Sequence, residues 1–145
     1  MDMAWADEWS VGNAVIDSDH KELVRLVGDI GHVARSGNNF ALSQVHIQFK
    51  SCLNRHFTNE EKLAGALGLP FAQHKREHQN IRDEIDFTDH ELRKNDAMTA
   101  YFREYYPRFL RDWLINHITE EDMLLKPLLQ ACPYEFKVDE APVCC

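Results

Sequence analysis

The chain has 145 residues and a formal net charge of −8, with 16 Lys and Arg against 24 Asp and Glu. This length fits a single domain with a sizeable hydrophobic core. Proteins that bind nucleic acid gather basic residues to neutralise phosphates, whereas the basic residues here are scattered among a larger number of acidic ones. The composition therefore argues against a nucleic-acid partner.

The sequence also predicts where the protein works. No basic segment followed by an apolar run opens the chain, and nowhere do about 18 apolar residues follow one another. We therefore expect a cytoplasmic protein with no membrane partner. Cys52, Cys132, Cys144 and Cys145 form no Cys-x-x-Cys pair and no disulfide framework, so we expect reduced thiols. The terminal Cys144-Cys145 pair leaves intermolecular disulfides, metal binding and inertness open.

Residues 1–17 lack sustained periodicity and carry Trp5 and Trp9, which predicts an extended arm that lays aromatic surface on the rest of the protein. A helix should follow from about residue 18, where the acidic and hydroxyl side chains of residues 17–19 offer N-cap oxygens. It should end at Gly37. Its apolar face begins with a histidine and comprises His20, Leu23, Val27, Ile30 and Ala34.

Two more helices are predicted before residue 94. The second should run from about Phe40 to Ala64 and end in a segment with two glycines and a proline. Its apolar face is interrupted by His56 and Glu60. The third should run roughly from Phe71 to Arg93, with His74 and His78 on its inward face.

The fourth helix should begin near Asp96 and run toward Leu124, with Pro107 kinking it or dividing it in two. Lys126-Pro127 indicates a stop or reset, and the tail from Pro133 to Cys145 should be mobile or lie on the surface. Helices of about 20 residues joined by short turns predict an all-α, antiparallel, up-down-up-down four-helix bundle. We expect one domain over 1–145, with an arm at 1–17, the bundle at 18–130 and a short tail at 131–145.

Seven polar side chains interrupt the apolar faces of these helices. Residues four apart on a helix differ by about 40° and stack one turn above the other, and in an antiparallel bundle all seven fall at the same end. Imidazoles and carboxylates on facing helices suit a pair of iron-like ions, and burying them without metal would cost several kcal/mol each. The seven candidate metal ligands are His20, His56, Glu60, His74, His78, His117 and Asp122.

The last pair of this set conflicts with regular helix geometry. A spacing of five residues turns Asp122 about 140° away from His117, whereas Glu121 would share its face. Helix geometry therefore leaves Glu121 and Asp122 open, and Asp122 needs a local distortion such as a π-type bulge. The other three histidines, His32, His46 and His90, have no suitable partner at helical spacing, and we interpret them as solvated or structural.

Six short motifs follow one another across about residues 5 to 130. They are Trp9-Ser10-Val11-Gly12, Ile16-Asp17, His20-Lys21, His56-Phe57-x-x-Glu60-Glu61, His74-Lys75-x-x-His78 and Asp112-Trp113-Leu114-x-x-His117-Ile118-x-x-x-Asp122. Together these motifs resemble the hemerythrin family in its bacteriohemerythrin form. The resemblance favours Asp122 over Glu121, because the family's last ligand pair is His-x-x-x-x-Asp.

The resemblance implies a non-heme diiron centre. His74, His78 and His117 would fill the shell of one iron, while His20 and His56 would hold the other and leave one position open. Glu60 and Asp122 would bridge the two irons together with a solvent-derived oxo or hydroxo group. This centre would bind dioxygen reversibly for storage, transport or delivery, as a carrier and not an enzyme. Apolar neighbours of the ligands are expected to wall the oxygen pocket: Leu23, Phe57, Trp113, Leu114 and Ile118.

The alternatives to an oxygen carrier are a sensor, a ferritin-like oxidase, a zinc hydrolase and a metal-free bundle. The same diiron site could sense oxygen, redox state or nitric oxide, which would need a signalling partner because no output domain is recognisable; a carrier could serve an oxygen-using enzyme. A ferritin-like oxidase is disfavoured because the sequence contains no Glu-x-x-His, and a zinc hydrolase because it contains no His-Glu-x-x-His. A metal-free bundle with coincidental histidines is the remaining alternative. The sequence does not fix the oligomeric state.

Overall fold

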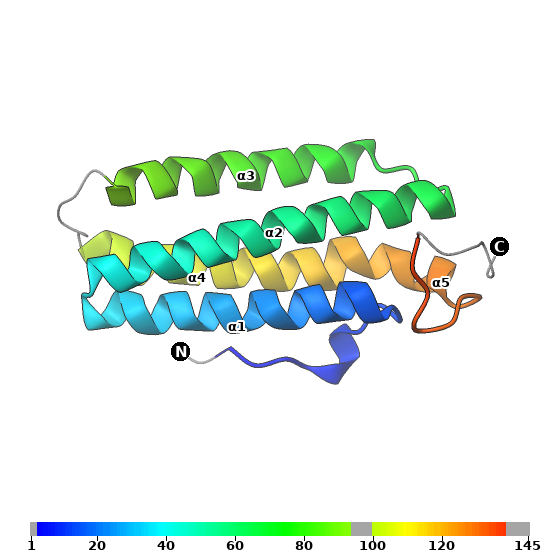
Figure 1. Cartoon of the computed structure of the whole chain (residues 1–145), viewed down its shortest axis with the longest axis horizontal. Helices are drawn as coiled ribbons and strands as arrows, with labels where there is room; N and C mark the ends of the chain where they lie inside the picture. The colour runs from blue at the N-terminus through cyan, green and yellow to red at the C-terminus, as the bar shows by residue number, and fades with distance from the viewer. Residues whose placement is uncertain (1–2, 94–99, 139–145) are drawn as a thin grey trace.

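The computed structural model describes residues 3–93 and 100–138, and it consists of helices joined by short connections. Four long helices make up the bundle, and each runs antiparallel to the one before it (Figure 1). They are α1 (Ala14–Ser36), α2 (Asn39–Leu67), α3 (Ala72–Arg93) and α4 (Ala100–Asn116). The up-down-up-down bundle expected from the sequence is confirmed.

The helix ends follow from particular cap residues. The Asn13 side chain accepts hydrogen bonds from the backbone N–H groups of Val15 and Ile16, so α1 begins at Ala14, four residues before the start at residue 18 that residues 17–19 suggested. Gly37 ends α1, as expected, in a left-handed conformation with a φ of 77°. Gly68 ends α2 in the same way, so the predicted end at Ala64 was one turn too early.

The fourth helix differs from its prediction in two places. Pro107 lies inside α4, which continues past it to Asn116, so the proline does not divide the helix. After α4 the backbone changes winding twice, through the π turn η2 (His117–Glu121) and the 3-10 turn η3 (Asp122–Leu125). The chain resets to an α-helix at Lys126-Pro127, where α5 (Lys126–Leu129) begins. The predicted start near Asp96 lies outside the described residues.

The arm and the tail both pack on the start of α1. The arm contains the 3-10 turn η1 (Asp7–Trp9) and runs along α1 (Figure 1). Its Trp5 and Trp9 rings lie edge to face 5.8 Å apart and pack against the core, as expected. The tail is held rather than mobile as far as residue 138, because the backbone oxygen of Tyr134 accepts from the Ala14 N–H and Phe136 is buried.

Two apolar clusters fill the bundle. The larger one occupies most of its length and includes Leu23, Phe49, Phe57, Leu110 and Leu114. The smaller one includes Val11, Ile16, Leu63, Leu125 and Phe136, and it closes the end where α1 begins and α2 ends. On α1, His20 lies in sequence between Ile16 of the smaller cluster and Leu23 of the larger one. The space between the clusters is therefore enclosed by apolar side chains on both sides.

The structure also bears on two further expectations, that the protein has no membrane-spanning helix and that its cysteines are reduced. No described helix is both long enough and apolar enough to cross a membrane. Cys52 is buried and free, but Cys132 is disulfide-bonded, so the expectation that every cysteine stays reduced was wrong. The pair Cys144-Cys145 lies outside the described part of the chain.

Candidate metal centre

The seven side chains singled out by the sequence lie together at one end of the bundle, between the two apolar clusters. Six of them have no exposed surface, and His74 is 7% exposed. They come from α1, α2, α3 and the turns that follow α4, so all four long segments of the bundle contribute. The expectation that the antiparallel helices bring them to a common level is confirmed by their mutual distances.

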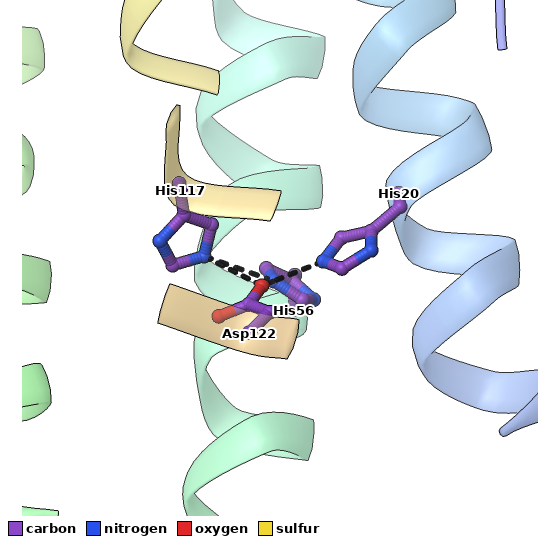
Figure 2. A group of neighbouring side chains, drawn as sticks. All are labelled: His20, His56, His117 and Asp122. Carbon is purple, nitrogen blue, oxygen red and sulfur yellow. Dashed lines mark hydrogen bonds and ion pairs between the residues drawn. The ribbon is translucent and has the colours of Figure 1, made fainter. Parts of the chain in front are cut away.

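Four imidazoles surround the Asp122 carboxylate. The Nε2 atoms of His20, His117 and His56 lie 2.7, 2.9 and 3.3 Å from Asp122 Oδ2. Figure 2 shows these three rings pointing from three separate segments at that one oxygen. On the other carboxylate oxygen, Oδ1, the His74 Nε2 atom lies at 3.0 Å. Asp122 is thus a common contact for residues far apart in the sequence.

The Glu60 carboxylate is surrounded in the same manner. The Nε2 atoms of His56, His78 and His117 lie 3.1, 3.3 and 3.5 Å from Glu60 Oε2. His74 Nε2 lies 2.8 Å from the second oxygen, Oε1. Three histidines therefore contact both carboxylates. Two sets of possible ligand atoms result, each within 4.8 Å of one another: His20, His56, His117 and Asp122 in one, and Glu60, His74, His78 and His117 in the other.

The π turn explains how Asp122 reaches this cluster. The backbone N–H of Asp122 donates to the carbonyl oxygen of His117, a spacing of five residues in place of the usual four. The extra residue rotates the chain so that the Asp122 carboxylate comes to the Nε2 side of His117. Glu121 lies on the opposite side of the ring, where its Oε2 is 2.8 Å from Nδ1. The expected local distortion is confirmed, and the two carboxylates have different positions.

Further carboxylates face the Nδ1 atoms of the same histidines. Asp19 Oδ2 lies 3.5 Å from His56 Nδ1, and Glu61 Oε1 lies 3.6 Å from His78 Nδ1. Carboxylates in this position favour a proton on Nδ1 and leave the Nε2 lone pair free to bind a metal. The sequence analysis did not predict that these carboxylates orient the histidines. It interpreted Asp19 as a possible helix cap and assigned no role to Glu61. Their position beside predicted ligands was the available signal.

The charges of the centre favour a cation. Burial lowers the pKa of His20, but at His56 and His117 the nearby carboxylates outweigh burial and hold the pKa well above its ordinary value. Burial opposes ionisation of both Glu60 and Asp122, and the charge of Asp122 further opposes that of Glu60, yet the surrounding imidazoles hold the pKa of both carboxyls well below normal. Both carboxylates are therefore anionic and require positive charge beside them, from protons or from metal ions.

Unsatisfied atoms show that the residues fit metal ions. His78 Nε2 and both Glu60 oxygens are buried without a hydrogen bond of suitable geometry. They lack one although His74 Nε2 lies 2.8 Å from Glu60 Oε1, and although His56 Nε2 and His78 Nε2 lie 3.1 and 3.3 Å from Glu60 Oε2. Buried polar atoms without partners cost about 1–3 kcal/mol each, so such a group needs an explanation. Lone pairs that point into a shared space rather than at donors suit a cation between them. Mixed imidazole and carboxylate donors are typical of transition-metal sites.

Aromatic rings cover the histidines. Phe57 stacks on His78 with ring centroids 3.7 Å apart, and Trp113 stacks on His117 at 4.9 Å. The other expected wall residues, Leu23, Leu114 and Ile118, are fully buried members of the larger cluster. Phe71 stacks on His74 at 4.3 Å and was not among the expected wall residues.

The three remaining histidines lie elsewhere. His32 and His90 are exposed, and His46 is buried with its Nε2 2.7 Å from the Tyr106 hydroxyl. These positions agree with the solvated or structural roles expected for them.

Comparison with known proteins agrees with this geometry. The family described as hemerythrin HHE cation binding domain matches residues 11–129. Bacteriohemerythrin of Methylococcus capsulatus is 30% identical over 131 residues, which cover 89% of this chain and 98% of that protein. Bacteriohemerythrin of Stenotrophomonas maltophilia is 27% identical over 122 residues, covering 83% and 76%. A crystal structure of wild-type hemerythrin superposes with a TM-score of 0.79 at 27% identity, over 89% of this chain and 98% of that one. The chain therefore belongs to the hemerythrin family.

Proposed function

We propose that this protein binds dioxygen reversibly at a non-heme diiron centre formed by the seven residues described above. Proteins of the hemerythrin family bind oxygen at a diiron site, and this chain matches the family over most of its length. The observation that carries the proposal is the convergence of five imidazole Nε2 atoms on two buried carboxylates. This arrangement supplies nitrogen and oxygen ligands for two ions side by side.

We propose that the ligands divide between two metal positions in the way the family resemblance implies. Of the two buried carboxylates, His78 contacts only Glu60 and His20 contacts only Asp122. The other three histidines contact both. We assign His74, His78 and His117 to one iron, and His20 and His56 to the other, with Glu60 and Asp122 bridging. The iron held by His20 and His56 would then have one protein ligand fewer than the other iron, which would leave a coordination position for dioxygen. An iron pair bound there would supply the two electrons that dioxygen takes up on binding and returns on release.

The surrounding residues favour reversible binding over catalysis. The two apolar clusters exclude water and proton donors from the space between them, which slows loss of the gas as a reduced product. Carboxylates at the Nδ1 atoms hold the imidazole rings in orientation. With metal ions in place of protons, five neutral imidazoles and two carboxylates would place less negative charge on the ions than carboxylate-rich sites do, which disfavours high oxidation states. We therefore propose a carrier and not an enzyme.

Two adjacent carboxylates provide a matched test of the ligand assignment. Asp122→Asn removes a bridging ligand and should abolish binding of two irons per chain, whereas Glu121→Gln changes the neighbouring residue and should retain both. Metal analysis of the purified variants measures this, with His56→Ala as a second ligand variant that should lower iron content. Two irons per chain in Asp122→Asn or His56→Ala would contradict the assignment.

Absorption spectra distinguish the carrier from a sensor. The reduced protein should change its spectrum on exposure to air and return to the reduced spectrum when oxygen is removed. Rapid, irreversible conversion to the diferric form would instead favour sensing of oxygen, redox state or nitric oxide with a signalling partner. The cytoplasmic location and an oxygen-using enzyme as recipient stay predictions.

A further inference from the structure

A surface cavity of about 410 Å³ lies in the groove between α1 and α4, away from the metal centre. Its floor contains Gly28 and Gly31 of α1 and Pro107 of α4. The N-terminal arm borders it through Met3, whose backbone and Cβ atoms lie 3.9 Å from where a Cβ on Gly28 would stand. Three segments that are distant in the sequence therefore build this groove.

Positive charge gathers around the groove. Four arginines line it, against a single carboxylate, that of Glu104. The chain as a whole carries a net charge of −8, so a quarter of its 16 basic residues lie at this one place. The basic residues look scattered in the sequence, but the pairing of α1 with α4 collects these ones. The four are Arg35, Arg103, Arg108 and Arg111.

Most of these guanidinium groups have no internal partner. Arg111 pairs with its neighbour Asp112 at 3.3 Å. Within residues 3–93 and 100–138, Arg35, Arg103 and Arg108 form no hydrogen bond or ion pair through their side chains. Guanidinium groups present several donors in a planar fork that matches carboxylate and phosphate oxygens. Three such groups beside one cavity can therefore accept an external anion without breaking an existing salt bridge.

The glycine floor keeps the groove open. Glycine in the interior of a helix is less stable than alanine by about 1 kcal/mol, so Gly31 in the middle of α1 is locally unfavourable. A Cβ there would lie 3.6 Å from Arg35 Nη1 and 3.7 Å from Pro107 Cβ, which are ordinary contact distances. Alanine would thus fit, but its methyl group would take up space in the floor between α1 and Pro107.

We propose that this groove binds a small organic anion with an apolar body and a carboxylate or phosphate head. The body would lie on the floor formed by Gly28, Gly31 and Pro107, and the head would contact Arg108 and Arg35. The cavity volume lies within the range of about 300–1,000 Å³ that is typical of small-molecule sites. Because the net charge of the protein repels anions elsewhere, binding should be specific to this groove and should weaken with salt.

Calorimetric titration of the full-length chain with four probes tests the proposal. Decanoate and decyl phosphate carry both features, decanol lacks the charge, and inorganic phosphate lacks the apolar body. At least one of the two amphipathic anions should bind once per chain, at least tenfold more tightly than decanol or inorganic phosphate. The tighter of the two identifies the preferred head group. Failure of both to saturate, or equal binding of decanol, would overturn the proposal.

Three variants locate the binding. Arg108→Gln should lower the affinity for the anion about tenfold, because it removes one charge-assisted contact. Gly31→Ala should also lower the affinity for the anion. The melting temperature of this variant should stay equal or rise, because alanine favours the helix. Arg76→Gln is the matched control, since Arg76 is exposed on α3 and outside the groove. Unchanged affinity in both groove variants, or the same loss in Arg76→Gln, would overturn the assignment.

Discussion

The Trp113 indole lies almost flat on the His117 imidazole, with 4.9 Å between ring centroids and 14° between ring planes. The same indole lines a surface cavity of about 350 Å³ between α3 and α4, together with Phe109 and Glu121. Trp113 therefore contacts the proposed ligand His117 and also lines a surface cavity. We infer that the indole ring separates His117 from solvent that enters the cavity.

Removing the Trp113 indole should shorten the lifetime of the oxygenated protein. Trp113→Ala would connect the groove to His117 and admit water and protons, so we expect spontaneous oxidation at least tenfold faster than in the unmodified protein. Decay of the oxygenated absorption spectrum in air measures the rate. Trp5→Ala, which removes an indole from the arm, should leave the rate unchanged. An unchanged rate in Trp113→Ala would show that protection of the centre does not depend on this ring.

The sequence predicts the helical faces well because burial of apolar side chains sets their period. Stripes of period 3.6 placed His20, His56 and His74 inward, and the antiparallel connections placed them at one end. His117 and Asp122 could not be paired in this way, because the π turn that joins them departs from the regular helix. The family resemblance, not helix geometry, favoured Asp122.

Features that depend on tertiary contacts were missed. The acidic and hydroxyl side chains of residues 17–19 suggested helix caps, but Asp17 accepts hydrogen bonds from the arm and the tail, and Asn13 caps α1. The arginine groove arises only when α1 and α4 lie side by side, which no local pattern reveals. Local periodicity in a sequence does not show which distant segments pack against one another.

Asp17 joins the N-terminal arm and the described part of the tail to the bundle. Its buried carboxylate accepts hydrogen bonds from the Ser10 hydroxyl, from the Val11 N–H at 2.9 Å and from the Tyr134 hydroxyl at 3.0 Å. Asp17→Ala leaves these donors without their charged acceptor, so we expect a loss of about 3 kcal/mol in the free energy of unfolding. Urea denaturation measures this loss.

Tyr134→Phe separates the contribution of the tail. It removes one of the three hydrogen bonds and should cost about 1 kcal/mol alone. In the Asp17→Ala background the same change should cost almost nothing, because its acceptor is already absent. Additive losses in the double variant would show that Asp17 and Tyr134 do not act together.

His46 should make stability depend on pH at the opposite end of the bundle. Its Nε2 lies 2.7 Å from the Tyr106 hydroxyl, and its Nδ1 lies 3.5 Å from Asp89, which also pairs with Lys50 and Arg93. Burial outweighs the attraction of Asp89 and lowers the pKa of His46 below its ordinary value of 6.5. The folded protein therefore holds this ring neutral, while the unfolded chain protonates it below about pH 6.5.

The stabilisation from neutral His46 is complete above the unfolded pKa and declines as the pH falls toward the lower folded pKa. The slope for this one proton is at most about 1.4 kcal/mol per pH unit. His46→Gln cannot titrate, so the stability advantage of the unmodified protein over the variant should be smaller at pH 5.5 than at pH 7.5. Comparing the two proteins cancels effects of the metal centre that they share. An equal advantage at both values would contradict the assignment.

Removing iron should destabilise the bundle as a whole. The proposed ligands come from α1, α2, α3 and the turns after α4, so bound metal ties these segments together in the native state only. A ligand present at 100 times its dissociation constant adds about 2.7 kcal/mol. At about 3 °C per kcal/mol for a chain of this size, chelation should lower the melting temperature by roughly 8 °C.

The recovery experiment separates metal binding from damage by the chelator. Ferrous iron added without oxygen should restore the original melting temperature of the stripped protein. In Asp122→Asn, stripping and reloading should change the melting temperature little, because the bridging carboxylate that holds the pair is absent. Acidification should strip the unmodified protein as well, since protons compete with metal for the Nε2 lone pairs. A chelated protein that melts at the original temperature would show that the buried histidines satisfy one another without metal.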